Sequence, residues 1–226
     1  MLADAVAVGA AFVLAVLVIV IVGMDALVRL VARLFAAPGV VVHEFAHKQA
    51  CDLVGVPVVE VVYFSFGNPP GYVRHGQPRR YRASFAISVA PFLVNTVVSL
   101  AAFFGVATLL FSNGIGVALE AGDAASVASA ALAELGAASS ETLALAAVLG
   151  WLGLSIGMGA FPSTGDANTL WARSRAEWRR SPIVLLGVPV VAVIYLVNLL
   201  SRLWADVFYA LALAVAAFYA VGPIGI

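Results

Sequence analysis

The sequence predicts an all-α polytopic membrane protein with about five full spans, a sixth, partly inserted helix, and a small β-hairpin at the membrane edge. Three observations predict this class. Of the 226 residues, 63% are hydrophobic and 11% are charged, and the mean hydropathy is +1.06. Soluble domains are only about 45–50% apolar and about 25% charged. Long apolar runs recur along the chain, and one of them contains the motif His43-Glu44-Phe45-Ala46-His47.

Five apolar runs are long enough to cross a hydrocarbon layer of about 30 Å, which needs about 20 helical residues. They lie at residues 5–23, 84–111, 143–160, 183–200 and 203–221. The first run begins close to Met1 with no basic segment before it, so we expect a retained helix rather than a signal peptide. No segment has the length of a separate soluble domain, and we therefore expect a single integral membrane domain over residues 1–226.

Two further elements lie between the first and second runs. Pro38-Gly39 predicts a helix break, followed by a new helix over about 38–54 that carries the histidine motif. Residues 58–66 are β-branched and aromatic, which is typical of a strand. The turn sequence at 67–71 and a possible return strand at 72–75 complete the predicted hairpin.

The arginines set the expected orientation, because basic loops face the cytoplasm. Arginine clusters occur at 29–33, 74–82 and 173–180. The segment 112–142 is acidic, and its composition predicts a loose loop or an interfacial helix. This pattern predicts a multi-pass protein of the cell membrane with its N-terminus outside. Both flanks of the helix at 38–54 then lie on the cytoplasmic side, so that helix must re-enter or be partly submerged.

Charge and cysteine content exclude some classes of protein. The formal net charge is zero, which gives no electrostatic reason to expect a nucleic-acid partner. Membrane lipids are expected partners, since the arginine clusters can contact lipid head groups. Cys51 is the single cysteine, so an intrachain disulfide is excluded.

The histidine motif carries the chemistry. Positions i and i+4 share one face of a helix, so His43 and His47 can ligate the same metal ion. Glu44 lies beside them and can act as the general base on a metal-bound water, which is the arrangement typical of zinc proteases. The alternative is a pair of surface histidines with a solvated glutamate. Unpaired ionisable groups are costly at membrane depth, which favours a site for one zinc ion per chain.

A catalytic zinc ion usually has three protein ligands, so one more is needed. Asp166 follows a turn sequence at the end of an apolar run, where a carboxylate can be aimed into the bundle. The alternative role for Asp166 is a helix cap. Cys51 is separated from His43 by about 12 Å along the helix axis, which favours a packed side chain over a ligand. Two other carboxylates remain possible ligands: Asp52 and Glu60.

These stretches resemble the site-2 protease family of intramembrane zinc metalloproteases. The resemblance is carried by the motif at 43–47 and by Phe161-Pro162-Ser163-Thr164-Gly165-Asp166. It covers about residues 36–171, which would form the catalytic core. In the family the metal-ligating aspartate follows a proline and usually precedes a glycine, whereas here the glycine precedes Asp166.

The family also has an asparagine shortly after a Gly-Pro pair in the intervening span. Here Pro91 follows an alanine, and Asn95 lies one residue further from the proline than in the family pattern. The resemblance implies that Asn95 donates a hydrogen bond to the developing oxyanion. An interhelical hydrogen bond is the alternative role for this side chain.

The resemblance implies a function in regulated intramembrane proteolysis. The chain would cleave a peptide bond within or near a transmembrane helix of a membrane-protein substrate. A transporter whose ionisable groups line a pathway is a second possibility, although the internal repeats it predicts are not evident in the sequence. A pseudoprotease that binds membrane clients without cutting them is a third, and the intact Glu44 argues against it.

Overall fold

The computed structural model describes residues 2–115, 124–179 and 181–222. The chain divides into two compact units, Met1–Ala36 and Ala37–Ile226. Helices dominate, and one sheet of two short strands is present in the second unit. The predicted helical class with a small hairpin is therefore confirmed at this level.

Helix α1 extends from Leu2 to Leu53, and its first part forms the first unit. The predicted span at 5–23 lies within it, although the side chains before Leu14 are outside the described part of the structure. From Leu14 to Phe35 most of the described side chains are apolar and exposed. Asp25 and Arg29 form an ion pair one helical turn apart.

The predicted helix break at Pro38-Gly39 is wrong, because α1 continues through both residues. Proline removes only one backbone hydrogen bond, and packed neighbours can satisfy the freed groups. The Gly39 N–H donates to Ser155 Oγ at 3.0 Å. A Cβ at Gly39 would collide with the Ser155 carbonyl. Gly39 therefore marks a close crossing of two helices and not the start of a new one.

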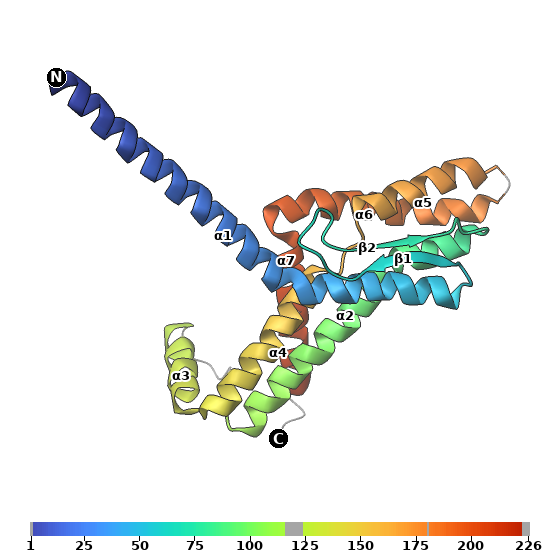
Figure 1. The fold of residues 1–226 in the computed structure, drawn as a ribbon. Helices are drawn as coiled ribbons and strands as arrows, with labels where there is room; N and C mark the ends of the chain where they lie inside the picture. The colour runs from blue at the N-terminus through green and yellow to red at the C-terminus, as the bar shows by residue number, and fades with distance from the viewer. Residues whose placement is uncertain (1, 116–123, 180, 223–226) are drawn as a thin grey trace. The chain divides into compact units, whose positions relative to one another are not determined.

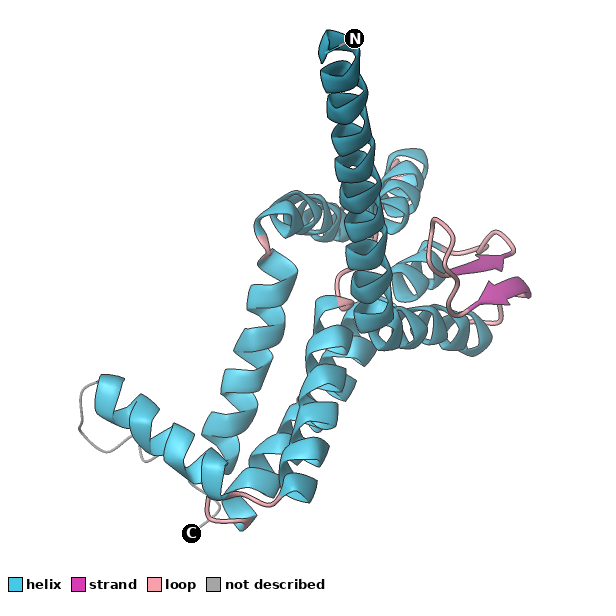
Figure 2. Ribbon diagram, turned by 60° about the vertical axis from the view of Figure 1, so that its left-hand side comes forward, coloured by secondary structure: helices cyan, strands magenta, loops and turns pink. Residues whose placement is uncertain are grey.

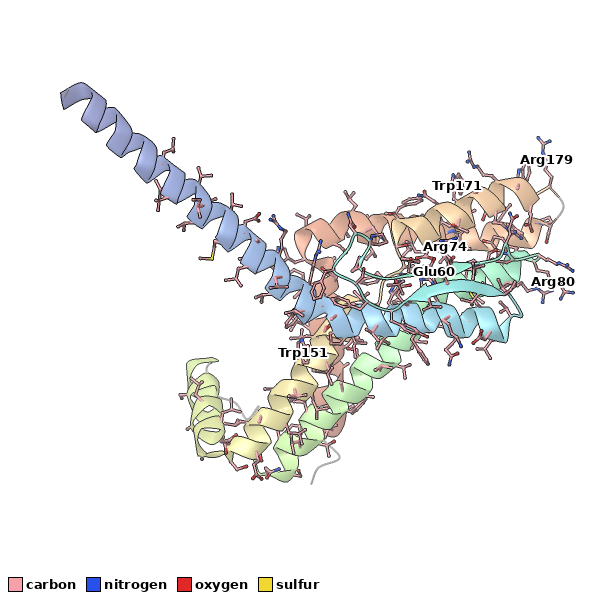
Figure 3. All side chains as sticks on the ribbon, viewed as in Figure 1. Glu60, Arg74, Arg80, Trp151, Trp171 and Arg179 are labelled. Atoms are coloured by element: carbon pink, nitrogen blue, oxygen red, sulfur yellow. The ribbon has the colours of Figure 1, made fainter. Side chains whose placement is uncertain are left out.

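The hairpin consists of β1, Val58–Val62, and β2, Tyr72–His75, paired antiparallel (Figure 1). The Glu60 carboxylate accepts hydrogen bonds from Tyr72 Oη at 2.9 Å and Arg74 Nη1 at 2.8 Å, and Figure 3 labels Glu60 and Arg74 on the two strands. The first strand is shorter than the predicted 58–66. At Ser65 the chain is already part of the connecting loop, where the Ser65 N–H donates a hydrogen bond to the Pro70 carbonyl.

Three helices of the second unit pack together: α2, Tyr81–Ser112; α4, Ser140–Met158; and α7, Ala205–Val221 (Figures 1 and 2). Their contacts use small residues, which let helix backbones approach closely. Ser99 Oγ donates to the Gly153 carbonyl at 2.7 Å. Gly153 is one of these small residues, because a Cβ there would lie 2.8 Å from the Phe103 ring.

Two helices extend along each other beside the hairpin (Figure 1): α5, Thr164–Glu177, and α6, Gly187–Leu200. Their shared core is apolar: Ala167, Leu170, Val191 and Ile194. Short 3₁₀ turns at Pro182–Leu186 and Ser201–Leu203 precede α6 and α7. The remaining helix, α3, covers Ala124–Ala137 within the segment predicted as a loop or interfacial helix, and residues 116–123 lie outside the described part.

Among the described residues, α2 and α4 are each long and apolar enough to cross a membrane. A third span results if α6 and α7, which are bent at the break between them, count as one broken span. The predicted total of five full spans and a sixth helix is therefore not confirmed. The runs at 183–200 and 203–221 form helices of 14 and 17 residues, shorter than the length of about 20 that a full span needs.

Candidate metal centre

The histidine motif forms one face of a turn of α1 in the second unit. The ring centroids of His43 and His47 lie 4.9 Å apart, as the i,i+4 spacing predicts. His47 is buried, with 8% of its surface exposed, and His43 is partly buried. The two imidazoles therefore present their nitrogens side by side in a largely enclosed setting.

Each histidine ring is oriented by a backbone carbonyl of another element: Gly159 directly after α4 for His43, and Ile87 in α2 for His47. His43 Nδ1 lies 2.8 Å from the Gly159 carbonyl oxygen, and His47 Nδ1 lies 2.9 Å from the Ile87 carbonyl oxygen. A carbonyl oxygen only accepts, so each Nδ1 must carry the proton and donate. The Nε2 lone pairs are then free to bind a metal. A backbone carbonyl is one of the usual acceptors for the second ring nitrogen of a metal-ligating histidine.

Asp166 reaches the same place from the start of α5. Ser163 is the N-cap of this helix, and Asp166 completes a capping box with it. Asp166 Oδ2 accepts hydrogen bonds from the Ser163 N–H at 2.9 Å and from Ser163 Oγ at 2.6 Å. Its other oxygen, Oδ1, lies 3.7 Å from His47 Nε2. One carboxylate oxygen, Oδ2, therefore caps the helix. The other, Oδ1, faces His47 and is placed where it could bind a metal ion.

His43, His47 and Asp166 form a group that could hold a metal ion, because one ligand atom from each lies within 4.8 Å of the others. Ligand atoms bound to one zinc ion at about 2.0–2.2 Å are at most about 4 Å apart. The described side chains come close to this spacing. Two imidazoles and one carboxylate also match the donor set of catalytic zinc sites. The residues present therefore fit a zinc ion, and its binding stays a prediction.

Glu44 is buried beside the two histidines, with 9% of its surface exposed. The loop that leads into β2 packs against it. A Cβ at Gly71 would lie 2.7 Å from Glu44 Cγ, 2.9 Å from Val40 Cγ1 and 3.1 Å from the Tyr63 carbonyl. The absence of a side chain at Gly71 therefore allows the loop to approach Glu44 this closely. The sequence indicated a turn around Gly71 but gave no sign of this contact.

Asn95 is fully buried on α2. Its Nδ2 lies 3.2 Å from the Gly39 carbonyl, 3.1 Å from the Ile156 carbonyl and 3.0 Å from the Gly159 carbonyl. The two amide hydrogens are directed at acceptors on α1 and at the end of α4. This is the geometry of the interhelical alternative considered for Asn95. The oxyanion role stays an untested prediction, and it would require an amide hydrogen to leave one of these carbonyls.

The other candidate ligands lie in separate contacts. Cys51 is fully buried and packs with Ala50, Val56 and Ile87, as expected for a packed side chain. The remaining carboxylates considered as ligands are paired with cations: Asp52 with Lys48, and Glu60 with Arg74. The hydrogen bond to the Glu60 carboxylate also raises the pKa of the exposed Tyr72 hydroxyl.

No protein-family model matches the chain, and neither a curated protein nor a solved structure gives a significant match.

Proposed function

We propose that the chain is an intramembrane zinc metalloprotease of the site-2 protease type. Its substrate would be a membrane protein, cut at a peptide bond within or near a transmembrane helix. One observation carries the proposal. Glu44 lies beside His43 and His47, whose rings are oriented by backbone carbonyls, and a carboxylate from a separate helix meets them.

The chemistry divides among the residues as follows. A bound zinc ion would supply Lewis acidity and a water of lowered pKa. His43, His47 and Asp166 would hold it. Glu44 would take a proton from the attacking water and transfer it to the leaving amine, as a general base and then a general acid. Burial of Glu44 beneath the loop at Gly71 keeps bulk water from competing for this proton.

The membrane setting supports a membrane-protein substrate. Helices α2 and α4 are long and apolar enough to span a bilayer, and Asn95 and the carbonyls it contacts lie on or beside them. We propose the finer topology as well: α1 partly inserted at its motif, the N-terminus outside, and the arginine-rich loops in the cytoplasm.

A transmembrane helix must unwind before its peptide bonds can be cut. Among the described residues the sheet consists of β1 and β2, so each of these strands has one edge that no other described strand pairs with. An extended segment can pair with such an edge through main-chain hydrogen bonds. We propose that the hairpin receives the unwound substrate in this way, close to the loop that packs on Glu44.

The test uses full-length protein reconstituted in proteoliposomes with single-span membrane proteins as substrates. We expect zinc-dependent cleavage and one zinc ion per chain by elemental analysis. Glu44→Gln should keep the metal and lose cleavage by a factor of about 10²–10⁴. The double variant His43→Ala, His47→Ala should lose both.

Four results would contradict the proposal in different ways. Undiminished zinc in the double histidine variant would remove the metal site. Cleavage by Glu44→Gln at the wild-type rate would remove the general base. Zinc binding and client binding without cleavage by the wild-type chain would favour the pseudoprotease, and absence of zinc from the wild-type chain would favour the transporter.

A further inference from the structure

A cavity lies apart from the metal centre. Its volume is about 470 Å³, and it is formed where the end of α1, the start of β1 and the segment before α2 meet. Small-molecule sites usually have volumes of about 300–1,000 Å³. Its lining contains none of the residues assigned to zinc or proton transfer, and it includes Arg79 and Arg80.

The walls of this cavity are fixed by hydrogen bonds. The Gly76 N–H donates to the Pro57 carbonyl at 2.8 Å, which ties the exit of the hairpin to its entry. Arg173 Nη1 on α5 donates to the Pro78 carbonyl at 2.7 Å, directly before Arg79. Both sides of the segment that carries the two arginines are thus anchored to other elements.

The cavity is cationic, because the neighbouring carboxylates are already engaged. Glu60 pairs with Arg74, Asp52 with Lys48, and Glu177 with Arg173. The ion pairs found among the described residues do not include Arg79 or Arg80. Figure 3 labels Arg80, which lies directly before the first residue of α2. Two guanidinium groups without a carboxylate partner favour an anion that accepts several hydrogen bonds, and a phosphate group is such an anion.

The rest of the lining is mostly apolar. Val54, Val56 and Ala83 contribute side chains without hydrogen-bonding groups. The cavity is also next to the first residues of α2, which is one of the helices able to cross a membrane. A ligand at this position therefore meets both cationic groups and an apolar surface. Basic pockets beside membrane spans are suited to anionic lipid head groups.

We propose that this cavity binds a phosphate group through Arg79 and Arg80, with the head group of an anionic phospholipid as its source at the membrane surface. The site is independent of the proposed protease activity. It would tie the start of α2 and the hairpin to the lipid surface. A free phosphate ion is the other source of the same chemical group, and the experiment distinguishes the two.

The experiment is isothermal titration calorimetry on full-length protein in nonionic detergent. Dihexanoyl phosphatidylglycerol, dihexanoyl phosphatidylcholine and inorganic phosphate are titrated separately. We expect saturable binding of the phosphatidylglycerol, weakened at least about tenfold in Arg79→Gln, Arg80→Gln. The matched control is Arg82→Gln, Arg175→Gln, which removes the same charge at two exposed positions outside the cavity and should bind as the wild type does.

Each outcome decides the proposal. Arginine-dependent binding of inorganic phosphate as tight as that of the lipid would identify free phosphate as the source. Equal binding of phosphatidylcholine, equal weakening in the control variant, or no saturable binding would overturn the site. If the double variant does not purify, Arg80→Gln alone should also weaken phosphatidylglycerol binding. Arg80 is exposed, so its substitution leaves the described packing intact.

Discussion

Asn95 and His43 share one hydrogen-bond acceptor. The Gly159 carbonyl oxygen lies 3.0 Å from Asn95 Nδ2 and 2.8 Å from His43 Nδ1. Asn95 also contacts the Gly39 carbonyl, one turn of helix before His43. The amide of Asn95 therefore links the helix that carries the histidines to the end of α4 that orients one of them. In the proposed enzyme, this makes Asn95 a positioning residue for a metal ligand.

Asn95→Ala should reduce both stability and zinc affinity. It removes the two amide hydrogens that face the Gly39, Ile156 and Gly159 carbonyls in a buried setting, which should cost about 1–3 kcal/mol in the free energy of unfolding. Zinc affinity should fall about tenfold, because the carbonyl that orients His43 is no longer held. Chelator competition and thermal unfolding in detergent measure the two effects.

Ser99→Ala is the matched control for this variant. Ser99 is also buried on α2, and its hydroxyl donates to the Gly153 carbonyl of α4 at 2.7 Å. It should lose stability but keep the wild-type zinc affinity. Equal zinc loss in the two variants would show that Asn95 acts only through helix packing.

Asp166→Asn should separate the two roles of this carboxylate. An asparagine oxygen can still accept from the Ser163 N–H, so the start of α5 should keep most of its stability. The group facing His47 would lose its negative charge, and zinc affinity should fall by at least about tenfold. Ser163→Ala is the converse variant, with a stability loss of about 1 kcal/mol and little change in zinc binding. Wild-type zinc affinity in Asp166→Asn would leave Asp166 as a helix cap alone.

Gly71→Ala should impair cleavage and leave zinc binding unchanged. The added methyl group would lie 2.7 Å from Glu44 Cγ and must displace either the glutamate or the loop. Small displacements of a catalytic group cost about 10²-fold in rate. Gly67→Ala in the same loop is the control, since its nearest neighbour is Ser65 Oγ at 3.3 Å. A wild-type cleavage rate in Gly71→Ala would show that this contact does not position Glu44.

The sequence predicted the parts of the site that depend on local spacing. The i,i+4 relation between His43 and His47 needs only a helix, and the turn sequence before Asp166 indicated a carboxylate near the histidines, whose Oδ1 lies 3.7 Å from His47 Nε2. The sequence could not predict the contacts that orient these side chains. The Gly159 and Ile87 carbonyls are backbone atoms of distant helices, and any residue type could supply them. Their role follows from the packing of α1, α2 and α4.

In the fold, too, local features could be predicted from the sequence, whereas contacts between distant elements could not. Composition and apolar runs predicted a helical membrane protein, and the β-branched run after Pro57 predicted the hairpin. Pro38-Gly39 was misread, because a Pro-Gly pair fits both a helix break and a close helix crossing. Only the position of Ser155 against Gly39 distinguishes the two. The runs at 183–200 and 203–221 were counted as two spans because hydropathy reports the apolar character of a run and not the bend between neighbouring helices.

The orientation in the membrane can be tested with single cysteines in a Cys51→Ser background, which removes the one native thiol. Three exposed positions serve as probes: Gln77, Ser140 and Ala176. Ser140→Cys should react with an impermeant maleimide on intact cells, because the acidic segment is expected outside. Gln77→Cys and Ala176→Cys should react only after permeabilisation, since their arginine-rich surroundings favour the cytoplasm. Labelling of Gln77→Cys on intact cells would reverse the orientation. The phosphate-binding cavity beside Gln77 would then face the outer leaflet, and the partly inserted placement of the motif helix would lose its basis.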